Sequence, residues 1–223
     1  MKQFSIIVAG GSGSRMGSKT PKQFLEIGGK PVLMHTIEKF IAYSNSIQVI
    51  LVLPQKEMGE WHRLCEKHDF YPAILTVSGG KTRFQSVRNG LAQIKVSEGL
   101  VAVHDGVRPF VDSEMIANGF ETAAKHGTAV TCVPLKDSVR VIDETGNNKA
   151  IDRNAYRLIQ TPQMFDLVKM KKAFETEEQP FFTDCASVME HAGHQITLID
   201  GSYNNIKITT PEDLLWAEVL VKN

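Results

Sequence analysis

Short apolar runs alternate with amphipathic stretches through the first 135 residues of the chain. Runs such as QVILVL and LVAVH are apolar at nearly every position, as buried strands are when helices cover both faces of a sheet. This alternation predicts an α/β fold with a Rossmann-like layered sheet, mostly parallel, whose strands are joined by crossover helices. The predicted strands are residues 4–9, 47–53, 74–77, 100–104 and 129–134, and the predicted helices are residues 32–42, 56–68, 83–94 and 113–126. Ligands of such sheets bind at the carboxyl ends of the strands.

The pattern changes at Lys136, where the chain becomes polar. Residues 136–158 alternate around a turn at 144–148 and have little apolar surface to lie on a core, so they predict a projecting β-hairpin arm. Arms of this kind usually contact a second subunit. Beyond the arm we expect helices at 167–174 and 183–191, a strand at 196–199 and a last helix that begins at Pro211, with Thr210 as its N-cap. No linker or repeat divides the sequence, so residues 1–223 are predicted to form a single domain.

Charge and cysteine content exclude several functional classes. Among 223 residues, Lys+Arg and Asp+Glu both total 25, so no overall basic field favours nucleic acid. The three cysteines, Cys65, Cys132 and Cys185, are widely spaced and lack a CxxC motif, which favours a reducing cytoplasm over a disulfide framework. The first apolar run is too short for a signal peptide or a membrane span. We therefore expect a cytoplasmic protein that binds neither nucleic acid nor membranes.

A glycine-rich loop, AGGSGSRMGSKTPKQFL, follows the first predicted strand at residues 9–25. A dinucleotide fingerprint needs GxGxxG, but Met16 occupies the place of the third glycine. A P-loop needs a glycine directly before the lysine of GK[ST], and neither Lys19 nor Lys22 has one. What fits is a backbone cradle for a triphosphate, with Arg15 and Lys22 as its cations. The alternative, a flexible turn with solvated charges, is common for glycine loops in general.

This loop resembles the signature loop of the cytidylyltransferase branch of the nucleotidyltransferases. The similarity continues in family order through SGGKTRFQSVRNGL, VHDGVRP, DRNAY, QTPQMF, TDCASVMEHAG and NIKITTPEDL, which together span nearly the whole chain. The resemblance implies an enzyme that joins CTP to a polyol phosphate and releases pyrophosphate. Within the branch, the blocks are most similar to those of members that use 2-C-methyl-D-erythritol 4-phosphate, an isoprenoid precursor, with ribitol 5-phosphate as the alternative acceptor. An NAD-dependent oxidoreductase and a non-catalytic nucleotide sensor are the competing classes.

The resemblance also implies roles for individual residues. Those matching the family's catalytic positions are Arg15, Lys22, Arg153 and Lys207. Those matching its nucleotide-binding positions are Ala9, Gly10, Gly11, Gly79, Gly80, Arg83, Ser86 and Asp105. Those matching its acceptor-binding positions are Arg108, Ser138, Arg153, Thr161 and Lys207. Asp105 would also hold Mg²⁺ or another divalent cation beside the nucleotide. In the family the arm crosses to the partner of a homodimer, so Arg153 is expected to act in the partner's site.

Elementary chemistry supports cations at these positions. Attack of a phosphate monoester on CTP brings two anions together, and the transition state crowds further negative charge around one phosphorus. The monoester is largely dianionic at neutral pH, so no general base and no catalytic histidine are expected. Structural roles compete with the functional ones: Asp105 could cap a turn, Ser86 a helix, and Arg153 could be a solvated charge. Two positions depart from the family pattern, since Asn204 replaces a frequent Asp and Ser138 a frequent Thr.

Overall fold

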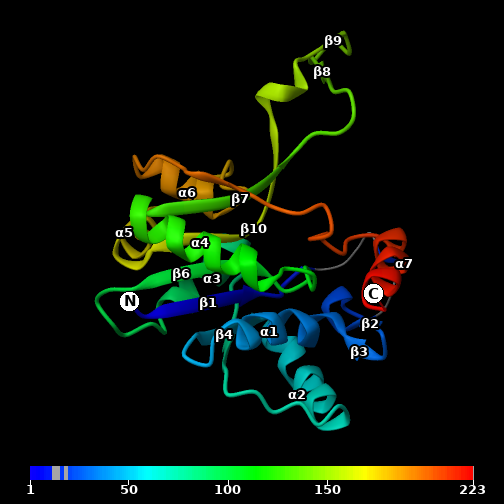
Figure 1. Cartoon of the computed structure of the whole chain (residues 1–223), viewed down its shortest axis with the longest axis vertical. Helices are drawn as coiled ribbons and strands as arrows, with labels where there is room; N and C mark the ends of the chain where they lie inside the picture. The colour runs from blue at the N-terminus through cyan, green and yellow to red at the C-terminus, as the bar shows by residue number, and fades with distance from the viewer. Residues whose placement is uncertain (12–15, 18–19, 223) are drawn as a thin grey trace.

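A seven-stranded sheet forms the centre of the molecule (Figure 1). The computed structural model describes residues 1–11, 16–17 and 20–222 of the chain. The strand order is β11-β7-β10-β6-β1-β4-β5, and every neighbouring pair is parallel except those that β10 makes with β6 and β7. The predicted α/β class with a mostly parallel sheet is therefore confirmed. The strands are β1 (Gln3–Val8), β4 (Gln48–Leu53), β5 (Leu75–Ser78), β6 (Leu100–Asp105), β7 (Thr128–Pro134), β10 (Arg157–Asp166) and β11 (Leu198–Asp200).

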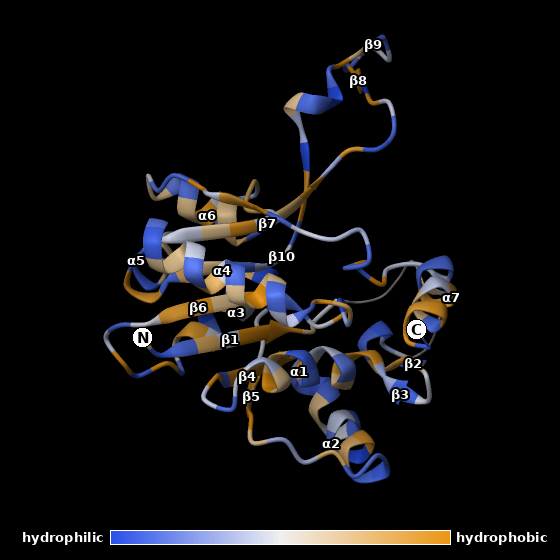
Figure 2. Cartoon of the chain, in the orientation of Figure 1, coloured by the Kyte–Doolittle hydropathy of each residue, from blue (hydrophilic) through white to orange (hydrophobic). Residues whose placement is uncertain are grey.

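Helices cover both faces of this sheet. They are α1 (Val32–Tyr43), α2 (Met58–Lys67), α3 (Arg83–Leu91), α4 (Ser113–His126), α5 (Leu167–Ala173) and α6 (Cys185–His191). A seventh helix, α7 (Pro211–Leu220), packs beside the edge of the sheet. Ile7 and Leu51 belong to the apolar cluster with α1, α2 and α4, whereas their neighbours Ile6 and Val52 belong to the cluster with α3, α5 and α6. Alternate side chains of one strand thus enter opposite layers, which is why central strands such as β4 and β6 are apolar at most positions. Figure 2 shows the apolar residues gathered in the central layers. None of the helices in the described residues combines the length and apolar character needed to span a bilayer.

Strand β10 was not predicted from the sequence. It contains Pro162, and proline is normally confined to edge strands because it cannot donate to the ladder. Here β10 lies in the interior of the sheet, but its register with β7 shifts between Ile159 and Gln163, so Pro162 falls where the ladder is interrupted. The side chain of Thr131 in β7 donates to the Pro162 carbonyl at 2.6 Å. A central strand accommodates proline because the interruption leaves that position without a ladder partner.

The ends of the later elements follow local hydrogen bonding. Helix α7 begins as predicted, with Thr210 as N-cap, Pro211 in the first turn and Asp213 completing a capping box. Helix α6 begins two residues later than the predicted 183–191, because the Asp184 side chain caps it by accepting from the Ser187 amide. The last strand is displaced to Leu198–Asp200 from the predicted 196–199.

A two-stranded hairpin projects from the body between β7 and β10 (Figure 1). Its strands are β8 (Arg140–Ile142) and β9 (Asn148–Ala150), inside the range predicted for the arm. The Asp143 carboxylate accepts hydrogen bonds from Thr145 and Asn147 in the turn. All six residues of β8 and β9 are exposed. The role of the arm in a dimer stays a prediction.

A small apolar cluster fastens the C-terminal helix to the loops beside the sheet edge. Its buried members are Ile27, Val32, Val107, Ile208 and Ala217. Ile27 belongs to a short hairpin, β2 (Glu26–Ile27) and β3 (Lys30–Pro31), which follows the 3-10 helix η2 (Lys22–Phe24). Helix α7 therefore holds together three segments that are distant in sequence but adjacent at the carboxyl edge of the sheet.

Close packing of α3 on the sheet generates a stability prediction. A Cβ added at Gly90 would lie 2.8 Å from Ile6 Cγ2 and 3.2 Å from Val52 Cγ2, and both neighbours are buried in strands. We expect Gly90→Ala to lower the free energy of unfolding by about 1–3 kcal/mol, because the helix must move away from the sheet. Gly59→Ala in α2 is the matched control, since no atom of the described residues lies within 4 Å of its added Cβ. Urea denaturation of both variants measures the difference, and equal stabilities would contradict this packing.

Candidate active site

A charged cavity of about 190 Å³ lies at the carboxyl ends of β1 and β6. Its walls come from the loop after β1, the 3-10 helix η2, the loop after β5, the end of β6 and the loop that leads from β11 to α7. This is the edge at which parallel sheets bind ligands. The structure brings together here nine of the residues singled out in the sequence: Ala9, Gly10, Gly11, Lys22, Gly80, Arg83, Ser86, Asp105 and Lys207.

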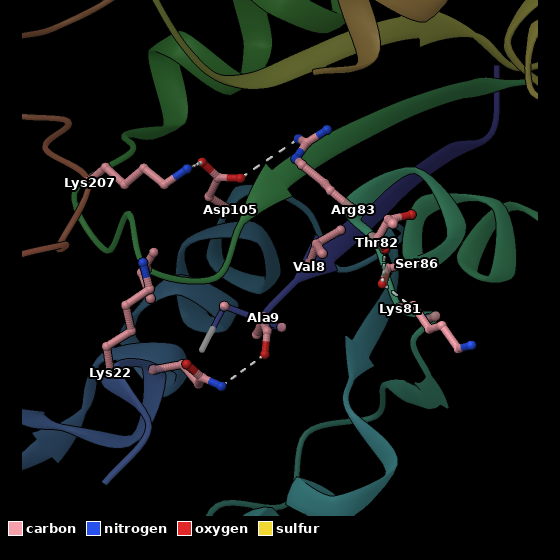
Figure 3. Close-up of a pocket in the computed structure, with 14 residues that line it drawn as sticks. Val8, Ala9, Lys22, Lys81, Thr82, Arg83, Ser86, Asp105 and Lys207 are labelled. Carbon is pink, nitrogen blue, oxygen red and sulfur yellow. Dashed lines mark hydrogen bonds and ion pairs between the residues drawn. The ribbon is translucent and has the colours of Figure 1, made fainter. Parts of the chain in front are cut away.

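Three cationic side chains surround the carboxylate of Asp105, and Figure 3 shows two of them, Lys207 and Arg83. Lys207 Nζ lies 2.9 Å from Oδ2, Arg108 Nε lies 3.5 Å from Oδ2, and Arg83 Nη2 lies 3.7 Å from Oδ1. Asp105 is the one carboxylate among the described residues that line this cavity. One negative charge thus faces three positive charges, which leaves the site with a net positive charge suited to an anionic ligand.

These cations also determine the ionisation of Asp105. Burial by itself raises the pKa of this carboxyl group, but the positive charges of Arg83, Lys207 and Arg108 outweigh burial and hold the pKa well below its usual range. Asp105 is therefore ionised at neutral pH, and its charge in turn favours the positive form of the guanidinium groups of Arg83 and Arg108.

Lys22 reaches the same cavity from the C-terminal part of the glycine-rich loop. It begins η2 directly after Pro21, and its residue is only 8% exposed. A Cβ on Gly11 would lie 3.2 Å from Lys22 Cε and 3.6 Å from its Nζ. Glycine at position 11 therefore leaves room for the ammonium end of Lys22 to lie close against the loop. Arg15, the other cation predicted for this loop, lies outside the described residues.

Gln23 is a lining residue that sequence reasoning missed. Its side chain is fully buried, and its amide nitrogen donates to the Ala9 carbonyl at 3.0 Å and to a Glu57 carboxylate oxygen at 2.5 Å. Burial raises the pKa of Glu57. Gln23 thus connects the end of β1 to η3 (Gln55–Glu57) directly behind Lys22.

The loop of residues 79–86 is organised around one hydroxyl group. Ser86 Oγ donates to the Thr82 carbonyl at 2.8 Å and accepts from the Gly80 amide at 3.1 Å. A Cβ at Gly79 would lie 2.9 Å from that oxygen, and one at Gly80 would lie 2.3 Å from Gln85 Cβ. Both glycines are therefore needed for the backbone to pass so close to the start of α3. Thr82 caps this helix by accepting from the Gln85 amide.

A second cavity, of about 230 Å³, adjoins the first. Arg83, Asp105 and Lys207 line both cavities. Arg108 and Thr161, two of the residues predicted to bind an acceptor, line only the second. The Thr161 hydroxyl oxygen accepts from the Asp105 amide at 3.0 Å. Sequence reasoning did not identify the five other residues that line the second cavity: Ile159, Gln160, Gln163, Thr183 and Asp184.

The two predicted site residues of the arm are not brought to either cavity. Arg153 and Ser138 are exposed, and neither lines the two charged cavities. Arg153 donates to the Lys136 carbonyl within the arm. Within one chain, therefore, these side chains stand apart from Asp105, as Figure 1 shows for the whole arm.

The histidine nearest to the site is neutral at physiological pH. His104 directly precedes Asp105 and is fully buried, and burial lowers its pKa to about 4. Its Nε2 lies 3.0 Å from the Arg108 carbonyl. The ring therefore supports the turn that carries Arg108 and does not add to the positive charge of the cavity.

The fold and the site together define a class of protein. An α/β sheet with a glycine-rich loop, two lysines and two arginines at its carboxyl edge is typical of enzymes that transfer phosphate-containing groups from nucleotides. The sequence from residue 4 to 223 matches the family model IspD, 2-C-methyl-D-erythritol 4-phosphate cytidylyltransferase. The chain belongs to this family, so the resemblance inferred from its motifs is confirmed.

Relatives and solved structures agree with this family over the full length. Two proteins named 2-C-methyl-D-erythritol 4-phosphate cytidylyltransferase are similar: one from Bacteroides thetaiotaomicron is 50% identical over 96% of this chain and 97% of its own. One from Bacteroides fragilis is 48% identical over 99% and 100%. The crystal structure of 4-diphosphocytidyl-2C-methyl-D-erythritol synthase from Anaerococcus prevotii has a TM-score of 0.84 at 30% identity, covering 99% of this chain and 96% of that chain.

The charge pattern around Asp105 generates a pH prediction. Because its pKa is depressed in the folded protein, its ionised form contributes stability above the unfolded pKa of about 3.9, and that contribution is lost as the pH falls further. We expect Asp105→Asn to destabilise the protein by at least about 1 kcal/mol at pH 7 relative to its effect at pH 3. Urea denaturation across this range measures it, with the exposed Asp137→Asn as control. A pH-independent difference would contradict the ion pairing.

Proposed function

We propose that this chain joins CTP to 2-C-methyl-D-erythritol 4-phosphate and releases pyrophosphate, forming 4-diphosphocytidyl-2-C-methyl-D-erythritol, an isoprenoid precursor. Its full-length membership of the family supports this reaction. The structural observation that carries the proposal is the pair of adjoining cavities that share Arg83, Asp105 and Lys207, since two anionic reactants must meet at one point.

The chemistry is a substitution at the α-phosphorus of CTP. A phosphate oxygen of the acceptor forms a bond to this phosphorus, and the bond to the oxygen that bridges the α- and β-phosphates breaks, so pyrophosphate leaves with the electron pair. No proton needs to be removed, because the acceptor phosphate is already largely dianionic. The protein's task is to gather positive charge where negative charge accumulates, and Lys22 and Lys207 do this from opposite ends of the sequence. Arg15 would add a third cation by family resemblance.

The two cavities suggest a place for each reactant. We assign CTP to the first, where Ala9, Gly10 and Gly11 offer backbone groups to the triphosphate and the loop of residues 79–86 borders the base and ribose. We assign the acceptor to the second, where Arg108 and Thr161 lie beside Asp105. Lys207 borders both, so it can contact the acceptor phosphate and the phosphorus that it attacks.

A divalent cation such as Mg²⁺ fits this site with Asp105 as its protein ligand. Mg²⁺ is typically held by one or two carboxylates together with phosphate oxygens and waters. Asp105 supplies one such carboxylate, and among the described residues no cluster of three metal-ligating side chains exists, so the triphosphate would provide most of the ligands. The ion would neutralise part of the triphosphate charge when bound.

We further propose a homodimer in which the arm of each chain completes the partner's site. The arm and its roots expose a series of apolar side chains that a second subunit would cover: Val141, Ile142, Tyr156, Leu158 and Ile159. Arg153 and Ser138 lie away from both cavities of their own chain, which supports their action on the partner. A cytoplasmic setting is part of the same proposal, because the three cysteines are buried and free.

Turnover with alternative acceptors tests the reaction. We expect pyrophosphate release from CTP to be fast with 2-C-methyl-D-erythritol 4-phosphate and slow with ribitol 5-phosphate, because the acceptor cavity is predicted to match the former. A coupled pyrophosphate assay with each acceptor, in the presence and absence of Mg²⁺, measures both points. Faster turnover with ribitol 5-phosphate would transfer the assignment to the alternative acceptor.

Hybrid dimers test the exchange of arms. We expect Lys22→Ala to reduce turnover by roughly 10²-fold or more, as the loss of a preorganised electrostatic contact typically does. If Arg153 acts in the partner's site, mixing Lys22→Ala with Arg153→Ala chains restores one intact site in each hybrid dimer. Recovered activity after mixing, with subunit exchange followed by native mass spectrometry, measures this. Exchange without recovery would show that each chain uses its own Arg153.

A further inference from the structure

A buried asparagine fastens the loop that carries Lys207 to the centre of the sheet. Asn205 lies between β11 and α7 and is 0% exposed. Its side-chain nitrogen donates to the Thr161 carbonyl at 2.8 Å and to Gln160 Oε1 at 3.2 Å. Both acceptors belong to the part of β10 where the ladder with β7 is interrupted. The side-chain amide of Asn205 thus bonds to the Thr161 carbonyl, a backbone acceptor at the interruption of the ladder, and to the side-chain oxygen of Gln160.

The main chain of the same residue holds a second cation. Arg108 Nη1 donates to the Asn205 carbonyl at 2.7 Å, while Arg108 Nε lies 3.5 Å from Asp105. Thr161, whose carbonyl receives the asparagine amide, also accepts from the Asp105 amide through its hydroxyl group. Asn205 is therefore bonded to two of the residues that flank Asp105 on the side of the second cavity.

Lys207 depends on this anchor for its position. The Ile208 amide donates to the Val107 carbonyl at 2.9 Å, so the segment is tied at residues 205 and 208, one on each side of Lys207. The lysine side chain itself is 42% exposed and makes its ion pair with Asp105 from that fixed backbone (Figure 3). A long, flexible side chain stays near one carboxylate only when its backbone is held in place.

We propose that Asn205 is a positioning residue for the reaction: its side-chain amide fixes the backbone that carries Lys207, and with it the Asn205 carbonyl that holds the guanidinium group of Arg108 for the acceptor phosphate. This inference rests on the proposed function. It predicts that loss of the amide impairs use of the acceptor more than binding of CTP, because the hydrogen-bond partners Gln160, Thr161 and Arg108 line the second cavity and not the first. An amide is required because two oxygens must each receive a hydrogen bond, and a carboxylate at this position would repel both.

Kinetics and exchange measurements on two variants test the proposal. In Asn205→Ala and Asn205→Asp, we expect kcat/KM for 2-C-methyl-D-erythritol 4-phosphate to fall about 10-fold or more, as small displacements of reacting groups can cause. The dissociation constant of CTP, measured by calorimetry with Mg²⁺, is expected to stay unchanged. Hydrogen–deuterium exchange should accelerate at the Ile208 amide. Asn204→Ala is the matched control, since this neighbour is exposed and its side chain makes no hydrogen bond with any described residue.

Different outcomes would overturn the proposed function and the positioning role of Asn205. Failure of the parent chain to use 2-C-methyl-D-erythritol 4-phosphate would overturn the proposed function, whereas faster exchange at Ile208 in the Asn205 variants alone would still support the anchoring. Kinetics like those of Asn204→Ala, or equal losses of CTP and acceptor binding, would overturn the positioning role. If both Asn205 variants fail to fold, the residue acts on global stability, and the proposal is wrong.

Discussion

The ion cluster around Asp105 is the interaction on which the rest of the site depends. A single carboxylate, 11% exposed, attracts cations from the start of α3, from the turn after β6 and from the loop before α7. Without it, three positive side chains would repel one another in a space that burial has largely closed to water. With it, they are collected into one region while the region as a whole stays positive. The same arrangement that stabilises the cations in the absence of ligand thus leaves the site with unbalanced charge for a triphosphate and a phosphate monoester.

The folded chain supports this cluster by packing on both sides of it. On one side, Ala217 of α7 packs with Ile27 and Ile208, which ties the hairpin after Lys22 to the segment containing Lys207. On the other side, the side-chain oxygen of Gln163 accepts from the two backbone amides that begin α6, and its nitrogen donates to Asp184. These bonds hold the start of α6, where Cys185 Sγ accepts from Arg83 Nη1 at 3.2 Å. Each cation is therefore held by its own structural element, and no single loop carries the whole site.

The sequence allowed most of the layered sheet and much of the cavity to be predicted, for physical reasons that differ. Strands such as β4 and β6 were predictable because burial on both faces requires unbroken apolar runs. The glycine loops were predictable because a close backbone approach needs glycine, as at Gly80. Strand β10 was missed because Pro162 contradicts its central position, and only the register shift with β7 explains the exception.

Residues that act through buried hydrogen bonds could not be predicted from a comparable pattern in the sequence. Gln23 and Asn205 are amides whose partners, Ala9 and Thr161, are distant in sequence, so neither spacing nor periodicity indicates that they meet. The exposed neighbour Asn204 departs from the family pattern, but the buried Asn205 makes the hydrogen bonds to Gln160 and Thr161. The ion pair of Arg83 with Asp105 likewise joins two segments whose proximity depends on the order of strands in the sheet.

The arm connects β7 and β10, which are neighbouring antiparallel strands of the sheet. Pro134 and Arg157 are paired across the antiparallel ladder, so the chain leaves and re-enters the sheet at adjacent points. In topological terms the entire arm is an elongated connection between two neighbouring strands, and a turn of a few residues could close the same ladder. The length and tip sequence of this connection can therefore change without any adjustment of the central layers, so the arm can vary while the packing beneath the charged cavities stays the same.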